Sequence, residues 1–493
     1  MSFKKIVFGG SYIFVFSLLA SVISYLTKMV LARNLSLSEY GLFFSVFAFV
    51  SFFLQFRDWG LNPALVRYTA LFNADNQFGK IKSAFVFSLS LQTVLSIIVC
   101  IFLFLFARFL SNSFFKDPLA EYLIYFFCAY VMISYWVTSL RAYFKGLQAY
   151  KIFGLSNFLR NSFIFLSTII FLYFGLGVFS PAMGYVLGWF FVTIIFFILF
   201  FKKKNIFSYK LQSFKKVSKK MFSFGVFAFF TDFGGKMIEQ IDTLMLTYFA
   251  NLELVGMYNI LIPTSMVMLV FVQTVSELVF PLASEAWAKK DTKTIIDWIS
   301  TIFRYYFLFI SPLFLLVAYY SKLLLSLLFD LHYAGSGIVL NVLLAGVFFL
   351  SLANLNNYVI AGMGLPKITT KAYFFAAIIN LVLNLVLIPY FWMIGAAIAT
   401  LLSYIFIFLF SSAFLSKKIN LNLDYFFHFK HLLVLLFFYF FIDFFNQTFS
   451  MIFTELVSFF INSFLFLFTY VVVIGRLYWN DCVRLKKLFR INR

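Results

Sequence analysis

Long runs of apolar residues, separated by short polar links, fill almost all of this chain of 493 residues. A helix needs about 20 predominantly apolar residues to cross the hydrocarbon core of a bilayer. Runs of that length recur fourteen times, so the pattern predicts an all-α integral membrane protein with about fourteen transmembrane helices. Their approximate ranges are 8–31, 40–60, 83–107, 119–141, 153–175, 180–201, 221–249, 256–284, 299–320, 338–361, 369–389, 392–415, 430–448 and 452–475.

The composition excludes most classes of soluble protein. Hydrophobic residues make up 63% of the chain and charged residues only 12%. A water-soluble globule of this composition would expose large apolar patches and aggregate. The formal net charge of +21 is compatible with a nucleic-acid partner, but no stretch is long and polar enough to form a basic soluble domain. We therefore expect no nucleic-acid partner and assign the charge to cytoplasmic links.

The basic residues also predict the orientation of the helices. If the N-terminus is cytoplasmic, most of the 39 Lys and Arg residues fall in cytoplasmic links, where such an excess is normal. We therefore expect a multi-pass protein of the inner or plasma membrane with both termini in the cytoplasm. The external links are all short, which leaves no room for an external catalytic or receptor domain. The basic residues that fall in external links are Arg33, Arg108, Lys116 and Lys322.

An internal repeat relates the first six predicted spans to the next six. Asn34 and Asn251 each end a span, and each is followed by a glycine, Gly41 or Gly256. The links FKGLQAYKI (144–152) and IAGMGLPKI (360–368) match at nearly the same offset. A shift of six spans preserves orientation, so the sequence predicts two six-helix lobes as a parallel repeat, followed by two C-terminal helices.

This repeat divides the chain into four predicted parts. They are an N-terminal lobe (1–201), a basic cytoplasmic linker (202–220), a C-terminal lobe (221–415), and the last two spans with a basic tail (416–493). In the linker, apolar residues recur at helical spacing between lysines, which predicts an amphipathic helix on the anionic inner leaflet. A solvated basic loop is the alternative. The apolar residues are Phe207, Leu211, Phe214, Val217 and Met221.

Four charges within the seventh predicted span call for an explanation, since each costs about 2.5–3.5 kcal/mol at membrane depth. Asp232, Lys236, Glu239 and Asp242 are spaced by four, three and three residues, so they share one face of the helix. This spacing predicts a polar stripe that lines a water-filled cavity between the lobes. The alternative is a stripe that pairs with itself and only fixes helix packing.

Other charges within predicted spans are weaker candidates. Arg57 and Asp58 lie near the inner end of the second span, where snorkelling is an equal alternative. Arg160 lies about two turns into the fifth span, and Glu277 lies in a polar patch of the eighth. Lys28 is near the outer end of the first span and is interpreted as snorkelling.

Signatures of enzymes, cofactors and metals are missing from the sequence. The three histidines lie at the edges of predicted spans, so no zinc site is indicated. No GxxxxGK[ST] motif is present, so this chain does not hydrolyse ATP through a P-loop. We expect no enzyme activity, no cofactor and no metal. The cysteines are scattered, which argues against a disulfide framework; they are Cys100, Cys128 and Cys482.

Several segments resemble polysaccharide flippases of the multidrug/oligosaccharidyl-lipid/polysaccharide superfamily, the group that includes the Wzx-type O-antigen flippases. These segments are YGLFFSVFAF (40–49), DWGLNPALVRYTA (58–70), FKGLQAYKI (144–152), IDTLMLTYFANLELVGMYNI (241–260) and NLVLNLVLIPYFWMIGAAIATLLSY (380–404). The resemblance covers about residues 1–415. It implies two lobes around a central cavity that opens alternately to each side of the membrane.

The resemblance also implies a substrate and a direction of transport. The substrate would be a polyprenyl-(pyro)phosphate-linked oligosaccharide, moved from the cytoplasmic to the outer leaflet for assembly of O-antigen, capsule or exopolysaccharide. Membrane lipids and polysaccharide polymerase or assembly proteins would be its partners. The substrate phosphates need cations, and depth and facing suggest Lys236, Arg160 and Arg57. The residues expected to bind a coupling ion are Asp232, Glu239, Asp242, Glu277 and Asp58.

Three alternative functions remain open from the sequence. A lipid II flippase of the same superfamily would carry more arginines in the first lobe. A drug or cation antiporter would carry acidic residues in both lobes, whereas here they are concentrated in the second. A membrane glycosyltransferase or polymerase would need a sizeable external loop and an external acidic cluster, and the chain has neither.

Overall fold

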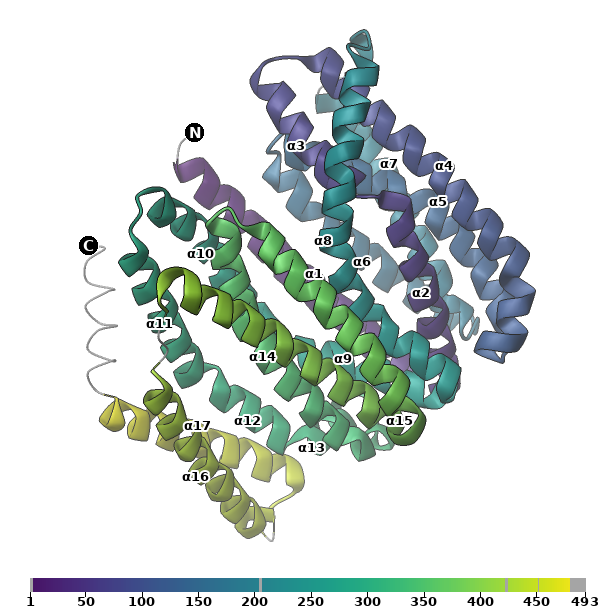
Figure 1. The fold of residues 1–493 in the computed structure, drawn as a ribbon. Helices are drawn as coiled ribbons and strands as arrows, with labels where there is room; N and C mark the ends of the chain where they lie inside the picture. The colour runs from purple at the N-terminus through teal and green to yellow at the C-terminus, as the bar shows by residue number, and fades with distance from the viewer. Residues whose placement is uncertain (1–2, 204–205, 422–423, 451, 479–493) are drawn as a thin grey trace.

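The computed structural model describes residues 3–203, 206–421, 424–450 and 452–478, which fold into helices joined by short links (Figure 1). These ranges contain 17 α-helices and no strand. A helix satisfies its own backbone hydrogen bonds, which makes it one of the few structures that can cross a bilayer. By length and apolar composition, 11 of the helical segments can span a membrane.

The N-terminal lobe contains the first seven helices, shown in purple to blue in Figure 1. A short π-helical turn (Ser111–Phe115) continues α4. The helices are α1 (Phe3–Asn34), α2 (Leu37–Asp58), α3 (Leu61–Ala74), α4 (Phe78–Leu110), α5 (Leu119–Gly146), α6 (Tyr150–Tyr173) and α7 (Phe179–Lys203).

The C-terminal lobe lies beside the first and is followed by a helical hairpin at its far edge (Figure 1). The lobe consists of α8 (Phe214–Phe249), α9 (Leu252–Met266), α10 (Leu269–Ala288), α11 (Thr292–Phe309), α12 (Ser311–Tyr319), α13 (Ser321–Leu328), α14 (Gly337–Gly362) and α15 (Pro366–Ile419). The hairpin consists of α16 (Tyr425–Ser450) and α17 (Glu455–Leu477).

Helix α15 is two antiparallel spans rather than one. Trp392 has a non-helical backbone (φ 51°, ψ −127°). Asn380 precedes Trp392 in the sequence and Thr400 follows it. The Asn380 amide nevertheless donates to the Thr400 hydroxyl at 3.2 Å, so the chain folds back on itself. Three more spans add to the 11 candidates: the second half of α15, helix α8, and the broken pair α9–α10. The total agrees with the predicted number of about fourteen. The predicted all-α membrane fold is therefore confirmed.

A break in the second span lets the N-terminal lobe contact α8. Trp59 and Gly60 both have positive φ values (43° and 67°), which ends α2 and starts α3. A methyl group at Gly60 would stand 2.0 Å from the carbonyl oxygen of Gly225, so only glycine fits there. The Trp59 ring stacks on Phe229 at 5.0 Å between centroids. The predicted end of the second span, at residue 60, coincides with this break, because polar residues such as Asp58 and Asn62 interrupt the apolar run there. The pattern did not predict the short helix α3 that follows.

The internal repeat is visible in equivalent packing contacts. Gly146, at the end of α5, lies against α3, where a methyl group would stand 2.8 Å from the Val66 carbonyl oxygen. Gly362, at the end of α14, lies against α10, where a methyl group would stand 2.7 Å from the Phe280 carbonyl oxygen. Each glycine thus lets the end of one long helix approach the second half of a broken span.

The start of the repeat differs by two residues from the predicted alignment of Asn34 with Asn251. The side chain of Asn251 caps α9 by accepting a hydrogen bond from Leu254 N at 2.9 Å. The equivalent cap of α2 is Ser36, which forms a reciprocal capping box with Glu39. Ser36 is thus the structural counterpart of Asn251.

The linker differs from the single amphipathic helix predicted over 202–220. The described residues form the end of α7, a short 3-10 turn (Ile206–Ser208), an irregular stretch and the start of α8. The stretch is tied to α4, because the Lys82 ammonium donates to the carbonyl oxygens of Phe207 and Tyr209, both at 2.8 Å. The backbone of Gln212 also bonds the Ser83 hydroxyl. Contacts with α4 therefore replace the predicted helix.

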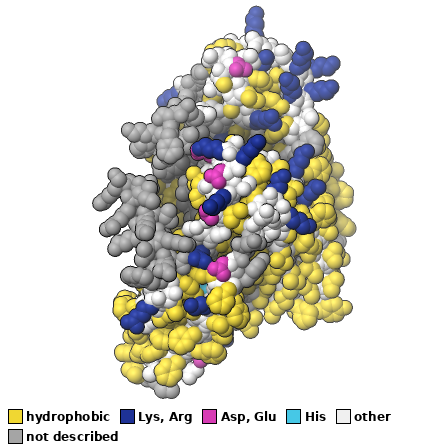
Figure 2. Space-filling view, turned by 60° about the vertical axis from the view of Figure 1, so that its left-hand side comes forward, with side chains coloured by type: hydrophobic (Ala, Val, Ile, Leu, Met, Phe, Trp, Pro, Cys, Tyr) yellow, Lys and Arg dark blue, Asp and Glu magenta, His cyan; other side chains and the backbone are white. Residues whose placement is uncertain are grey.

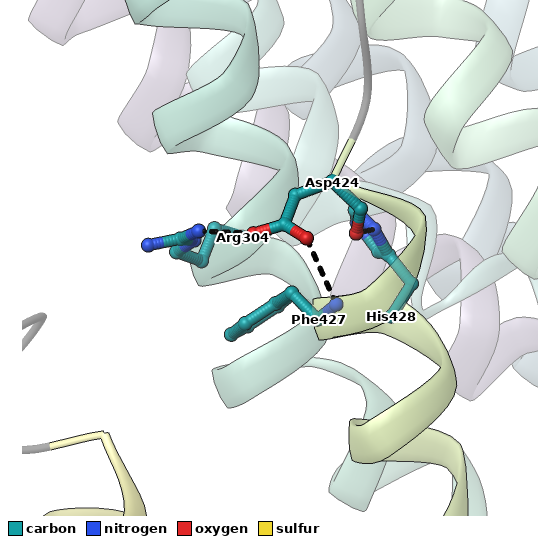
Figure 3. Close-up of polar contacts among 4 residues, drawn as sticks. All are labelled: Arg304, Asp424, Phe427 and His428. Atoms are coloured by element: carbon teal, nitrogen blue, oxygen red, sulfur yellow. Dashed lines mark hydrogen bonds and ion pairs between the residues drawn. The ribbon is translucent and has the colours of Figure 1, made fainter.

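The hairpin of α16 and α17 is joined to α11 by the four residues of Figure 3. Asp424 accepts hydrogen bonds from the Arg304 guanidinium at 2.7 Å and from the Phe427 backbone at 3.0 Å, which starts α16. His428 Nδ1 lies 2.6 Å from the Asp424 carbonyl oxygen. One turn further, His431 is fully buried and hydrogen-bonds Ser311. Both histidines of α16 therefore serve helix packing.

Two of the scattered cysteines are neighbours in the fold. The Cys100 thiol of α4 lies 3.5 Å from the Cys128 carbonyl oxygen of α5, and the Cys128 thiol lies 3.9 Å from the Cys100 carbonyl oxygen. Both thiols are free. Cys482 lies outside the described residues. The sequence separation of 28 residues gave no sign of this pair, because the helical hairpin of α4 and α5 creates it.

Candidate functional site

Three adjoining cavities lie between and within the two lobes, each with a volume of about 400 Å³. The N-lobe cavity is lined by α1, α6 and α9, the C-lobe cavity by α8, α14 and α15, and the central cavity by residues of both lobes. Met266, in the broken eighth span, lines all three. A site of this size suits a ligand rather than a single ion.

The cations of this site are Lys28 and Arg160. Both line the N-lobe cavity, and Lys28 also lines the central cavity. Arg160 was predicted as a phosphate ligand, whereas Lys28 was interpreted as a snorkelling residue. The structure brings these two cations to one cavity wall from helices that are far apart in the sequence.

Packing contacts hold both cations toward the cavity. The Arg160 guanidinium lies over the Trp189 ring at 5.0 Å, and its Nε donates to Asn161 at 3.1 Å. The Asn161 amide in turn donates to the Ala20 carbonyl oxygen at 2.7 Å, which joins α6 to α1. The Lys28 ammonium lies 5.4 Å from the Phe44 ring centroid. Among the described residues, neither cation forms an ion pair with an acidic residue.

A periodic signal in the sequence could have identified Lys28. Ser17, Ser21 and Ser24 precede it at spacings of four, three and four residues, and all four side chains line the N-lobe cavity. Polar residues at helical spacing mark one face of a span as facing a cavity rather than lipid. The analysis of single charges overlooked this stripe.

Asp242 lies at the boundary of the central cavity with the C-terminal lobe and is 3% exposed. Its carboxylate accepts hydrogen bonds from the Tyr258 hydroxyl at 2.7 Å, the Asn384 amide at 2.6 Å and the Thr400 hydroxyl at 2.5 Å. Asn380 completes the cluster by donating to Thr400. A buried carboxylate is costly unless neighbouring donors or a cation stabilise its charge.

The same cluster offers oxygen ligands for a small cation. The amide oxygen of Asn384 is buried and has no hydrogen-bond partner within the described ranges, although its amide nitrogen bonds Asp242. The side-chain oxygens of Asp242, Asn384 and Thr400 are therefore gathered within one buried cluster. Across the described side chains, no group of three or more His, Cys, Asp and Glu residues could hold a metal ion. The Asp242 cluster, with one carboxylate and neighbouring neutral oxygens, offers a place for a proton or a monovalent cation.

Lys236 and Glu239 form an ion pair of 2.5 Å on α8, and both side chains are about half exposed. Glu239 lines the central and C-lobe cavities, whereas Lys236 lines none of the three. The charge of Lys236 is therefore balanced by its own helix. The pair agrees with the self-pairing alternative, whereas the place of Glu239 on two cavities agrees with the predicted polar stripe. The predicted role of Lys236 as a phosphate ligand stays a prediction.

The second-span candidates have structural contacts instead. Arg57 is 5% exposed, and its guanidinium donates to the Val131 carbonyl oxygen at 3.0 Å and to the Ser134 hydroxyl at 2.7 Å. Asp58 accepts a hydrogen bond from the Asn62 backbone at 3.2 Å, near the start of α3. Neither residue lines the three cavities. They stabilise the break between α2 and α3 and its contact with α5.

The two remaining acidic candidates are Asp232 in α8 and Glu277 in α10. Their backbones belong to described helices, but their side chains lie outside those that the structure describes. The predicted role of each in ion coupling therefore stays a prediction.

The lobes contact each other at the end of the bundle that is predicted to face outward, in addition to the contact of Trp59 and Gly60 with α8 near the other end. Arg33, at the end of α1, donates to the Leu327 and Leu328 carbonyl oxygens of α13. The Thr247 hydroxyl donates to Ser45 at 2.8 Å, which joins α8 to α2. The C-lobe cavity, by contrast, reaches Thr369 in the first turn of α15, which lies at the end of the bundle that is predicted to face the cytoplasm. The cavities thus extend toward the face that is predicted to be cytoplasmic.

The surface agrees with a membrane setting. Figure 2 shows Lys and Arg side chains at the upper end of the molecule, and acidic and basic side chains in a strip down its middle, with hydrophobic side chains beside them. Large apolar side chains remain exposed over much of the bundle, including Tyr173 at 88% and Phe464 at 72%. Such exposure is stable only against lipid.

Comparisons of the sequence identify a family and two curated relatives. Residues 6–287 match the model of a family described as polysaccharide biosynthesis protein. An uncharacterized membrane protein of Methanocaldococcus jannaschii is 30% identical over 441 residues, which are 85% of this chain and 86% of that protein. The probable low-salt glycan biosynthesis flippase Agl15 of Haloferax volcanii is 23% identical over 218 residues, 44% of this chain and 46% of that protein.

Solved structures share the fold at low sequence identity. The lipid II flippase MurJ, in an inward closed conformation, superimposes with a TM-score of 0.75 over 94% of this chain and 99% of MurJ, at 14% identity. An inward-facing multidrug resistance transporter of the MATE family superimposes with a TM-score of 0.65 over 81% of this chain and 94% of that protein, at 13% identity. These matches support the arrangement of two lobes.

Proposed function

The chain belongs to the polysaccharide biosynthesis protein family of the multidrug/oligosaccharidyl-lipid/polysaccharide superfamily, and on this basis we propose that it flips a polyprenyl-(pyro)phosphate-linked oligosaccharide. It would move this lipid from the cytoplasmic to the outer leaflet by alternating access, to supply assembly of a surface polysaccharide. The glycan-related relative in Haloferax volcanii supports this substrate class.

The placement of Lys28 and Arg160 on one cavity wall is the observation that carries this proposal. A (pyro)phosphate presents charged oxygens, and ammonium or guanidinium groups form strong, charge-assisted hydrogen bonds with them. Because neither cation is paired with an acidic residue among the described side chains, both can serve a bound anion. Lys236, whose charge Glu239 balances, is a poorer candidate.

The rest of the substrate sets the other requirements of the site. A polar oligosaccharide cannot cross about 30 Å of hydrocarbon unaided, whereas its lipid tail can stay in the bilayer. The cavities supply polar walls for the head group, including Asn157 and Asn161 near the cations and Asn259 in the central cavity. Polymerase or assembly proteins on the outer side would then use the flipped lipid.

We assign the coupling ion, a proton or a monovalent cation, to the Asp242 cluster. The carboxyl group of Asp242 is buried on a wall of the central cavity, so a change in the occupancy of this site by an ion can favour one arrangement of the lobes. A membrane potential of 100 mV provides about 2.3 kcal/mol per charge moved, which is enough to bias an alternating-access cycle.

A drug or cation antiporter is less consistent with these contacts. A cationic drug would need an unpaired acidic group at the cavity, whereas Glu239, an exposed acidic residue of the described cavity walls, is paired with Lys236. The N-lobe wall would repel such a ligand through Lys28 and Arg160.

Transport of a fluorescent lipid-linked disaccharide in proteoliposomes tests the proposal. Protein-dependent access of the sugar to an external lectin, without transport of a cationic drug such as ethidium, supports glycan flipping. Transport of ethidium alone would overturn it. A repeat with all gradients collapsed tests the coupling, which undiminished flipping would contradict.

A further inference from the structure

The C-lobe cavity has chemistry that the phosphate and ion sites do not use. Its walls carry Tyr358, Tyr373 and Tyr404, together with the amides of Asn354 and Asn357. Tyrosine combines an apolar ring face with a polar hydroxyl, and such residues beside a few polar groups are typical of small-molecule sites. Among the side chains that the structure describes, no cation lines this cavity.

Asn357, on the wall of the C-lobe cavity, has buried polar atoms without hydrogen-bond partners. The residue is 6% exposed, and neither its amide nitrogen nor its amide oxygen has a partner at normal geometry within the described ranges. The Tyr373 hydroxyl lies nearby but donates to Asn354 at 3.1 Å. The Thr369 hydroxyl, which lines the same cavity, is also unsatisfied. Buried polar groups without partners are rare and costly, which points to a ligand that bonds them.

We propose that the C-lobe cavity binds the saccharide portion of the transported lipid, with Asn357 bonding sugar hydroxyls and the tyrosine rings packing on the apolar face of a sugar ring. A neutral sugar presents alternating C–H and O–H groups, which match a wall of ring faces, amides and a hydroxyl. This inference rests on the proposed flippase function and adds a residue that determines glycan affinity.

The position of the cavity is consistent with a single extended ligand. Met266 and Leu269 line both the C-lobe and the N-lobe cavities, so the two spaces adjoin. A head group with its phosphate at Lys28 and Arg160 can therefore place its sugars beside Asn357. The phosphate and saccharide sites then lie on opposite lobes, and one ligand bridges both.

Binding of two kinds of probe to the full-length protein in nanodiscs tests the inference. The first probe is farnesyl phosphate, and the second is a panel of farnesyl phosphates that carry a hexose, N-acetylhexosamine or uronic acid disaccharide. The wild-type protein is expected to bind at least one glycosylated probe more tightly than farnesyl phosphate. Asn357→Leu should remove about tenfold of that gain, since it deletes two hydrogen bonds, and should leave farnesyl phosphate binding unchanged.

Two further variants keep the test decisive if Asn357→Leu does not fold. A methyl group at Gly235 would meet only Tyr373 Cδ1, at 3.8 Å, so Gly235→Leu extends into the cavity without removing a hydrogen bond. It should also abolish the gain from the sugar. The control is Gly475→Leu, at a glycine where an added methyl group has no atom of the described residues within 4 Å.

The outcomes separate this inference from the proposed function. If no glycosylated probe binds more tightly than farnesyl phosphate, or if Gly235→Leu retains the full gain, the saccharide site is overturned while phosphate binding stands. If the wild-type protein binds neither kind of probe, the proposed function itself fails. If Gly235→Leu folds but loses affinity for both kinds of probe to the same extent, the assignment of separate phosphate and saccharide sites is also overturned.

Discussion

Gly41 of α2 and Gly256 of α9 lie against each other where the two lobes meet. A methyl group at Gly41 would stand 2.9 Å from the Gly256 backbone nitrogen and 1.8 Å from the Leu252 carbonyl oxygen. A methyl group at Gly256 would in turn stand 2.4 Å from the Leu37 carbonyl oxygen. The contact is thus reciprocal, as expected for equivalent positions of a parallel repeat about an axis. The lobes can approach this closely because neither glycine has a side chain.

This contact predicts that Gly41→Leu separates the lobes at their outer end. Overpacking of this kind costs about 1–3 kcal/mol, which is enough to shift a two-state equilibrium. The reporter is Ser45→Cys, in a background without native cysteines, because Ser45 is fully buried beside Thr247. Gly41→Leu should make it reactive toward an impermeant maleimide added outside. Unchanged protection, equal to that of a Gly475→Leu control, would contradict the outer seal.

Asp242→Asn should retain flipping and lose its dependence on an ion gradient. The asparagine is similar in shape and can still accept hydrogen bonds, but it carries no charge that an ion could neutralise. Flipping by Asp242→Asn should therefore be the same with and without an imposed gradient in proteoliposomes. A gradient response equal to that of the wild type would show that the coupling ion binds elsewhere.

Asp242→Leu should instead damage folding. It would leave the buried donors of Tyr258, Asn384 and Thr400 without their acceptor, at a cost of about 1–3 kcal/mol for each unsatisfied group. Thermal unfolding in detergent should therefore occur at a lower temperature than for Asp242→Asn. Equal stability of the two variants would argue against the hydrogen-bonded cluster.

Cys100 and Cys128 should be linked by a short bifunctional thiol reagent in a Cys482→Ser background. Their thiols contact each other's backbone across α4 and α5, so both reactive groups are within reach of one small linker. Mass spectrometry of the digested protein should show the two peptides joined, and Cys128→Ser should abolish the product. Separate modification of each thiol, with no linked peptide, would contradict this pairing of helices.

A cysteine at Lys210 should react only with reagent supplied from the cytoplasm. Lys210 is exposed in the stretch that joins the lobes, and the excess of basic residues predicts that this stretch is cytoplasmic. The measurement is labelling of Lys210→Cys by impermeant maleimide in intact cells and in inverted vesicles. Labelling in intact cells would reverse the orientation.

The sequence predicts the spans well because the cost of exposing polar groups to lipid makes long apolar runs obligatory. It also predicts the parallel repeat through glycines such as Gly146 and Gly362. It also places the breaks at Trp59 and Trp392 at the edges of predicted spans. It does not predict the break that divides the predicted span 256–284 into α9 and α10. The apolar pattern is the same on both sides of such a break.

The candidate site was predicted only in part. Helical periodicity offered the pairing of Lys236 with an acidic residue one turn away, which the contact with Glu239 shows. It could not show that Asp242 turns into the lobe. The partners Asn384 and Thr400 are 142 and 158 residues away from Asp242, and only the fold brings them together. Lys28 was overlooked because its depth was judged alone, without the serines that precede it on α1.

The central claim is that cations of the N-lobe cavity bind the phosphate of a lipid-linked glycan, and flipping by two matched double variants tests it most directly. Lys28→Ala with Arg160→Ala removes both cavity cations, whereas Lys236→Ala with Glu239→Gln removes a paired cation together with its partner. Each charge-assisted contact contributes about 1.5–3 kcal/mol, so we predict that the first variant loses at least about 100-fold in flipping rate. The second variant should retain most of the wild-type rate. Undiminished flipping by a folded Lys28→Ala, Arg160→Ala protein would contradict the account.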